Sequence, residues 1–166
     1  MTAIADALDR INRAVGAFAL WLSLAMVLLQ FAIVVMRYAF GFTSIFVNEA
    51  VLYLHASLFM LGAGYTMLVG GHVRVDIFHA KMTDAGKARV DLAGHVLLLF
   101  PALAMLLWWS WPMVSRSWAI WEGPISVGGI PASFLLKSLI PAYAGLLMVQ
   151  GVSALLRDVL RARAVA

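Results

Sequence analysis

Four long stretches of this chain contain no Asp, Glu, Lys or Arg, and apolar residues dominate each of them. They cover residues 14–36, 50–71, 92–115 and 138–156. An α-helix rises about 1.5 Å per residue and the hydrocarbon core of a bilayer is about 30 Å thick, so about 20 apolar residues are enough to cross it. The pattern therefore predicts an all-α integral membrane protein with four transmembrane helices.

The predicted spans follow these stretches, except that the fourth begins earlier. Lys137 lies about 30 Å along a helix from Arg157, which places it at the outer membrane interface. We expect its ammonium group to reach the lipid headgroups, and residues 124–136 to lie on the outer leaflet or dip just into it. The predicted spans are about 14–36, 50–71, 92–115 and 134–156.

Composition leaves little protein outside the membrane. Of 166 residues, 64% are hydrophobic and only 12% are charged, whereas soluble domains carry about 25% charged residues. We therefore predict a single membrane domain over residues 1–166. The absence of cysteine excludes disulfides and thiolate metal sites. Residues 5–13 are typical of an amphipathic lead-in helix, and we expect no cleaved signal peptide.

The positive charges predict the orientation. The twelve Lys and Arg residues divide nine to three between alternate connecting segments, and the side richer in Lys and Arg is normally cytoplasmic. Both termini are therefore predicted to be cytoplasmic, and the net charge of +4 does not indicate nucleic-acid binding. The larger group comprises Arg10, Arg13, Arg74, Lys81, Lys87, Arg89, Arg157, Arg161 and Arg163, and the smaller comprises Arg37, Arg116 and Lys137.

Local signals predict several helix ends. Glu49 is expected in the first turn of the second helix, where the helix dipole favours an anion. The glycines at 70–71 are typical of a helix end, and Thr83 is a candidate N-cap for the third helix. Pro101 should kink that helix, and Pro112 should end it.

Charged residues flank the connections. Arg37 and Glu49 flank the first outer connection, where they would pair with each other or with a partner subunit. Arg74 and Asp76 flank the exit of the second span in the same way. Charges at such positions most often anchor the topology.

The predicted membrane centre carries almost no ionisable chemistry, because no carboxylate falls inside the four spans. Gln30, Ser57 and Thr66 are the polar groups at some depth, and such residues more often hydrogen-bond within the helical bundle than line a transport path. An ion-coupled carrier normally needs ionisable or broken-helix sites at mid-membrane. The chain alone is therefore a poor candidate for the moving part of a transporter.

The histidines are candidate haem ligands, since four-helix membrane anchors can hold haem between two of them. His55 and His95 differ in predicted depth by roughly 20 Å, so they cannot bind one iron. His72 and His95 lie near the same face, but His72 follows a Gly-Gly helix end. Interfacial hydrogen bonding is the simpler interpretation.

A set of short motifs occurs in order along almost the whole chain. They are Arg37-Tyr38, Asn48-Glu49, the run LGAGYTMLVGGHVRVDIF at residues 61–78, Gly129-Ile130-Pro131, Lys137 and Ile140-Pro141. With the four-span layout, this pattern resembles the small membrane subunit of tripartite ATP-independent periplasmic (TRAP) transporters.

The resemblance implies a bacterial inner-membrane protein that is not an enzyme and holds no cofactor or metal. In that family a periplasmic solute-binding protein delivers a solute, commonly an organic acid, to a large membrane subunit. The large subunit moves the solute by an elevator motion coupled to sodium. The small subunit enlarges the stationary scaffold, in contact with the large subunit and membrane lipids. Gly62, Gly64, Gly94 and Gly145 would allow close helix packing.

The resemblance also implies roles for particular residues. Structural or large-subunit contacts are expected at Arg37, Glu49, Gly62, His72, Arg74, Asp76, Lys137 and Pro141. Contacts of the outer face with the binding protein are expected at Trp118, Trp121 and Glu122.

The sequence leaves two other functional classes of membrane protein open. One is a haem- or quinone-binding anchor subunit of a respiratory complex. The other is a small self-assembling exporter, against which the lack of an intramembrane acid argues.

Overall fold

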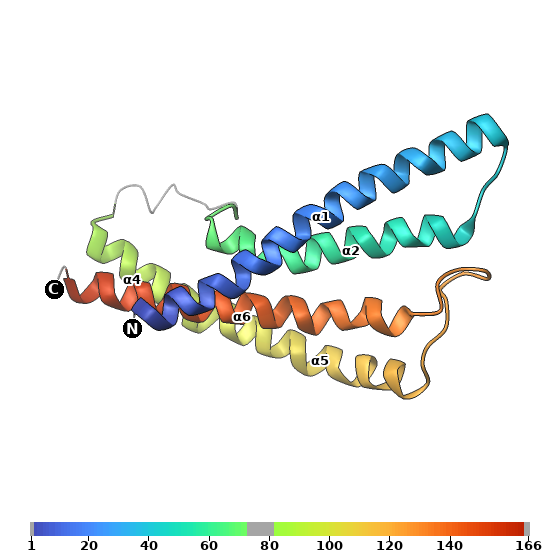
Figure 1. The fold of residues 1–166 in the computed structure, drawn as a ribbon. Coiled ribbons are helices and arrows are strands. Elements are labelled where there is room, and N and C mark those ends of the chain that lie inside the picture. Colours follow the sequence, from blue (N-terminus) through green and yellow to red (C-terminus); the bar gives the residue numbers. More distant parts are fainter. Residues whose placement is uncertain (1, 73–81, 165–166) are drawn as a thin grey trace.

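The structure is a computed structural model that describes residues 2–72 and 82–164, and this part of the chain is helical with no strands (Figure 1). Four of its helical segments are long and apolar enough to cross a membrane. The prediction of an all-α protein with four membrane-length helices is therefore confirmed. The elements are α1 (Thr2–Phe40), α2 (Ile45–Leu68), α4 (Asp84–Gly94), a π-helical turn η1 (His95–Leu99), α5 (Phe100–Ala119) and α6 (Ser133–Ala164).

Two helices begin differently from the sequence-based expectation. Residues 5–13 do not form a separate lead-in, because α1 is continuous from Thr2 to Phe40. The second helix begins at Ile45, so Glu49 lies beyond its first turn and the dipole argument for that residue was wrong. The glycine stop is confirmed: Gly70 has a φ of +68°, and the Gly71 N–H donates to the Thr66 carbonyl at 2.8 Å.

The third membrane helix consists of α4, η1 and α5 in direct succession. Thr83 caps its start as predicted, since its hydroxyl accepts a hydrogen bond from the Gly86 N–H at 3.3 Å. Pro101 has no N–H to donate to the preceding turn. The backbone widens just before it, where the Phe100 N–H bonds to the His95 carbonyl five residues back.

The prediction that Pro112 ends the third helix was wrong, because α5 continues through it to Ala119. A proline inside a helix leaves one carbonyl without its usual backbone donor. In membrane proteins, neighbouring helices, Ser or Thr side chains or water can donate to that carbonyl instead, so the helix can continue.

Helix α6 is the central element, since it contacts α1, α2, α4 and α5. Its Ala144 and Leu147 form the buried core with Ala63 of α2 and Leu103 of α5. The α1–α2 hairpin and the α5–α6 hairpin approach each other through this helix (Figure 1). Small residues at the core allow the close approach that van der Waals packing between membrane helices requires.

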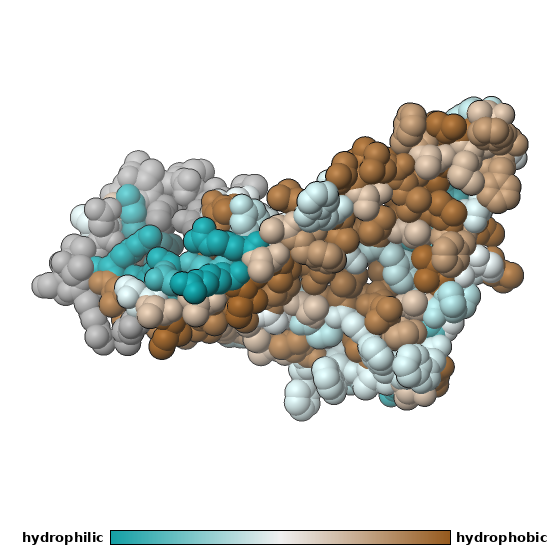
Figure 2. Space-filling view, in the orientation of Figure 1, coloured by the Kyte–Doolittle hydropathy of each residue, from teal (hydrophilic) through white to brown (hydrophobic). Residues whose placement is uncertain are grey.

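We call the end of the bundle with the connections at 41–44 and 120–132 the outer end, and the opposite end the inner end, following the predicted topology. Large apolar side chains cover the outside of the bundle between the two ends, as expected for lipid or subunit contact. Polar residues gather at the inner end (Figure 2). Among the most exposed apolar side chains are Leu20, Trp21, Phe31, Phe59, Leu98, Trp108 and Trp109.

Candidate interhelical and subunit-contact sites

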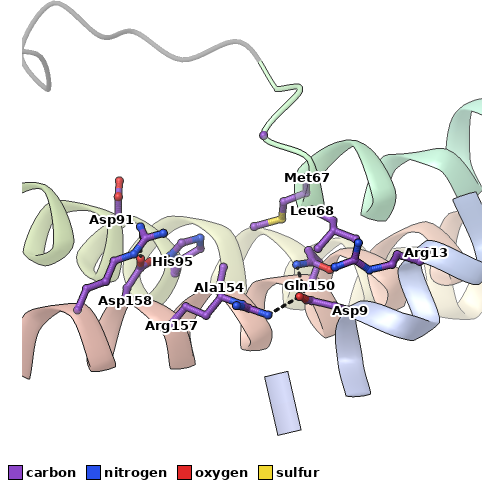
Figure 3. Close-up of a pocket in the computed structure, with 12 residues that line it drawn as sticks. Asp9, Arg13, Met67, Leu68, Asp91, His95, Gln150, Ala154, Arg157 and Asp158 are labelled. Atoms are coloured by element: carbon purple, nitrogen blue, oxygen red, sulfur yellow. Dashed lines mark hydrogen bonds and ion pairs between the residues drawn. The ribbon is translucent and has the colours of Figure 1, made fainter. Parts of the chain in front are cut away.

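Asp9 is the centre of a hydrogen-bonded network that joins α1 to α6 at the inner end. Its side chain is almost fully buried, with 3% of the residue exposed. One carboxylate oxygen accepts hydrogen bonds from Ser153 at 2.5 Å and from Gln150 at 3.1 Å. The other accepts from the Arg157 guanidinium at 2.6 Å (Figure 3), and Arg157 also bonds the exposed Asp6 at 2.8 Å. A buried carboxylate needs such partners, because an unpaired charge there would be very costly.

Asn12 extends the same network one turn further along α1. It is completely buried and donates to the Gln150 side chain at 3.0 Å and to the Leu146 carbonyl at 3.4 Å. Gly64 of α2 packs directly on the Asn12 side chain, so a methyl group at Gly64 would overlap it. The network is therefore enclosed by three helices, and glycine is required where α2 crosses it.

A second ionic group lies beside this network. His95, the first residue of η1, has its Nδ1 3.3 Å from Asp158 of α6. Arg161 lies 3.6 Å from the other oxygen of Asp158. The Asp158 side chain is buried, with 7% exposed. The widened turn before Pro101 therefore contacts α6 through a polar pair.

Glu49 organises the outer end. Only 7% of it is exposed, and its two oxygens accept backbone hydrogen bonds from Ser126 at 2.9 Å and from Ile130 at 2.7 Å. Gly129 lies against the carboxylate so closely that a methyl group would overlap it. The predicted pairing of Glu49 with Arg37 was wrong, because the connection between α5 and α6 folds back over α2 and supplies amides that have no helical partner.

Lys137 forms an ion pair with a residue of the connection between α5 and α6. Its ammonium group lies 2.7 Å and 2.5 Å from the two oxygens of Glu122, a protein partner that the sequence analysis did not predict, and its contact with headgroups stays a prediction. Ser117 also donates to Glu122. The hydrogen bond from Lys137 is the largest cause of a lowered pKa at Glu122, with that from Ser117 next. This pair joins the end of α5 to the start of α6.

An aromatic cluster covers the same connection. The rings of Trp118, Trp121 and Phe134 meet edge to face, with centroids 4.7 to 5.7 Å apart. The indole N–H of Trp118 donates to Ser138 at 2.7 Å. Trp121 remains 67% exposed. Edge-to-face aromatic packing favours one arrangement of the loop.

Comparison with known protein families shows which family this chain belongs to. Residues 26–161 match the family described as Tripartite ATP-independent periplasmic transporters, DctQ component. This chain belongs to that family. No curated protein and no solved structure gave a significant match. The resemblance inferred from the motifs is therefore confirmed, and the chain is a multi-pass membrane component of a TRAP transporter.

The other residues highlighted by the resemblance occupy separate places in this DctQ-family subunit. Arg37 is exposed in the last turn of α1, and Pro141 lies inside α6. His72 lines a cavity between α1 and α2 that also includes Gly62. Arg74 and Asp76 lie outside the described residues. Roles for these positions in subunit contact stay predictions.

The four glycines expected to allow close packing divide into two kinds. Only Gly64 is in tight contact within the subunit. A methyl group at Gly62, Gly94 or Gly145 would meet nothing within 4 Å, so these three glycines are not tightly packed within this chain, and close packing against a partner helix stays a prediction for them. Two other glycines inside helices are tightly packed instead, Gly16 against Tyr65 and Gly151 against Leu99.

Sequence reasoning missed the inner network, although its spacing was visible. Asp9 and Asn12 are three residues apart on α1, and Gln150, Ser153 and Arg157 follow at intervals of three and four on α6. Such spacing places each set on one helix face. Two polar faces on otherwise apolar helices indicate that they face each other.

The histidines do not share one site in the described part of the chain. His72 lines the cavity between α1 and α2, whereas His95 contacts Asp158 and lines a different cavity. Among the described residues, no group of three or more His, Cys, Asp or Glu side chains could hold a metal ion. The family match favours a transporter component over a respiratory anchor.

Proposed function

We propose that this subunit is the stationary, non-catalytic scaffold of a sodium-coupled TRAP transporter for an organic acid or similar solute. It would pack against the large elevator-type subunit, which carries the solute and the sodium sites. A periplasmic solute-binding protein would deliver the solute. Both termini of the small subunit would lie in the cytoplasm of the bacterial cell.

The observation that carries this proposal is that the two helical hairpins are tied together at both ends. Asp9 of α1 bonds Ser153, Gln150 and Arg157 of α6 at the inner end. Glu49 of α2 bonds the connection between α5 and α6 at the outer end. Sliding of one hairpin past the other would break several buried hydrogen bonds, each of which is costly to leave unmade. Such a subunit suits the part of an elevator that holds still.

Contacts with the large subunit are proposed at surfaces that the subunit itself leaves uncovered. Arg37 is exposed and the Gly62 surface is open, so both are accessible to a neighbouring helix. The exposed Trp121 ring lies on the face proposed to meet the binding protein. Glu122 and Lys137 would support that face through their ion pair rather than by direct contact.

A cysteine crosslink tests the stationary role directly, because the chain contains no native cysteine. Ala63 of α2 and Ala144 of α6 belong to the same buried cluster. The double variant A63C/A144C would be reconstituted in vesicles with its large subunit and binding protein, and oxidised. We expect sodium-driven uptake within about twofold of the reduced sample. Loss of uptake on oxidation, restored by reduction, would show that α2 must move against α6 and would overturn the stationary role.

A second experiment tests whether the subunit is needed at all. Vesicles that contain the large subunit and binding protein without this chain should show little sodium-driven uptake. Uptake at the full rate without it would contradict the scaffold proposal. Reactivity of single cysteines at residues 2 and 162 with an impermeant reagent, from the inside only, would support the predicted orientation.

A further inference from the structure

A cavity of about 360 Å³ opens at the inner end between α1, α2, α4 and α6 (Figure 3). Its volume lies within the range of about 300–1,000 Å³ typical of small-molecule sites. Its walls come from the inner ends of all four charge-free stretches of the sequence. The cavity therefore lies at the depth where a bilayer changes from hydrocarbon to headgroups.

The cavity wall carries charges of both signs. Three arginines and three aspartates line it, namely Arg13, Arg157, Arg161, Asp9, Asp91 and Asp158. Asp9 and Arg157 satisfy each other, and Asp158 contacts both His95 and Arg161. Arg13 makes no hydrogen bond or ion pair with any other residue within the described ranges 2–72 and 82–164.

The two sides of the cavity differ in chemistry. Arg13 lies on one side, while His95 and Asp158 lie on the other (Figure 3). Met67 and Leu68, at the end of α2, add an apolar part to the wall. A ligand that fits must offer an anionic group to Arg13, a cationic group toward Asp158, and apolar atoms beside the α2 end.

We propose that this cavity binds the headgroup of a zwitterionic phospholipid with a phosphate and a primary amine, of the phosphatidylethanolamine class. The phosphate bonds the Arg13 guanidinium, a geometry that arginine favours. The amine lies toward Asp158, and the glycerol and acyl chains leave past Met67 and Leu68. The wall carries three arginines and three aspartates, so its charges balance in number, and a ligand with one anionic and one cationic group complements it better than a ligand with net charge. The interfacial depth and the apolar wall favour a lipid over a soluble phosphate.

Native mass spectrometry of the full chain in detergent tests this proposal. The delipidated protein would be titrated with dioleoyl phosphatidylethanolamine, phosphatidylcholine or phosphatidylglycerol at equal concentration, and separately with inorganic phosphate. We expect phosphatidylethanolamine to be retained roughly fivefold more than the other two lipids. Phosphatidylcholine has the same phosphate, but its methylated amine cannot donate hydrogen bonds. Inorganic phosphate should not compete at millimolar concentration.

Matched arginine variants locate the site. Arg13→Gln should lower retention of phosphatidylethanolamine by about tenfold, the loss expected for a charge-assisted hydrogen bond. Arg10→Gln removes a positive charge from the same helix at an exposed position outside the cavity, and should leave retention unchanged. Thermal unfolding of both variants checks that they are folded, and Arg13→Lys should restore part of the retention.

Each alternative result overturns the proposal in a recognisable way. Equal or stronger retention of phosphatidylglycerol would indicate an anionic-lipid site. Competition by inorganic phosphate would indicate a free-anion site. Equal effects of Arg13→Gln and Arg10→Gln would indicate only general lipid contact. None of these outcomes depends on transport, so the scaffold role is tested independently.

Discussion

The inner and outer ends of the bundle both join its two hairpins, but they do so with different chemistry. At the inner end, side chains of α1 bond side chains of α6, and Asp9, Asn12 and Ser153 are buried between the helices. At the outer end, one side chain of α2, Glu49, bonds backbone amides of a connection. The inner end thus fixes helix against helix, whereas the outer end fixes a loop against a helix.

The difference predicts how the stability of each end would change when a substitution removes its hydrogen bonds. Removal of the Asp9 carboxylate leaves its buried partners Gln150 and Ser153 without an acceptor between two packed helices. The amides of an outer connection can be hydrated once they are released, because the connection lies outside the apolar stretches. We therefore expect the loss of a hydrogen bond at the inner end to lower the free energy of unfolding of the whole bundle. The loss of one at the outer end should mainly loosen the connection between α5 and α6.

The largest effect is expected from Asp9→Ala. It leaves Ser153, Gln150 and Arg157 without their shared acceptor, and should lower the free energy of unfolding by about 3 kcal/mol. Asp6→Ala is the matched control, because Asp6 bonds the same arginine but its side chain is 56% exposed. That control should cost less than about 1 kcal/mol. Reversible unfolding in mixed detergent micelles measures both, and equal losses would contradict the buried role of Asp9.

The next effect is expected from Glu49→Ala. Release of the Ser126 and Ile130 amides should lower stability by about 2 kcal/mol and raise hydrogen exchange at these two amides much more than in α6. Asn48→Ala is the control, since Asn48 is exposed and bonds only the nearby Ser44 carbonyl. If hydrogen exchange rises equally in α6 and in the connection, Glu49 stabilises the whole bundle rather than the connection alone. That result would contradict the proposed difference between the two ends.

A smaller effect is expected from Gly64→Ala. The added methyl group overlaps Asn12 and comes within 3.2 Å of the Leu146 side chain, which should cost about 1 kcal/mol through overpacking. Gly62→Ala, two residues away on the same helix, meets nothing within 4 Å and should be neutral or slightly stabilising. Thermal unfolding of the two variants side by side checks this. The reverse order of stability would indicate that α2 does not cross the inner network as described.

The smallest effect is expected from acidification at the outer pair of Lys137 and Glu122. Because the pKa of Glu122 is lowered in the folded state, the pair contributes stability above the unfolded pKa of glutamate, about 4.3. That contribution is lost as the pH falls through the lower folded pKa. The stability difference between the unmodified chain and Lys137→Ala should therefore be present at pH 7 and disappear near pH 3. A difference that persists unchanged at pH 3 would show that Lys137 stabilises the chain by packing rather than by this ion pair.

Several features were predictable because they depend on local chemistry. The four helices followed from stretches without charge, since a charged side chain at the membrane centre is costly. The glycine stop at 70–71 and the Thr83 cap followed from backbone geometry that few residues provide. The family followed from short motifs in a fixed order.

The partners of the charged residues were less predictable. Glu49 and Lys137 were correctly expected near the outer end, but the partners that the structure gives them were not predicted. Each binds residues of the connection between α5 and α6, and how that connection folds is not set by its own sequence pattern. Asp9 was assigned to an amphipathic lead-in helix, because the spacing of its polar neighbours shows one helix face but not the partners of each side chain.

The sequence by itself determined the number of helices, their membrane character and the family of this protein. These follow from the free energy of placing each residue in lipid or water, which depends mainly on residue type. Only the tertiary structure decided which polar groups meet, including Asp9 with Arg157 and Glu49 with Ser126. Such contacts depend on the relative rotation of helices and on the course of one connection, because hydrogen bonds require partners at defined distances and angles.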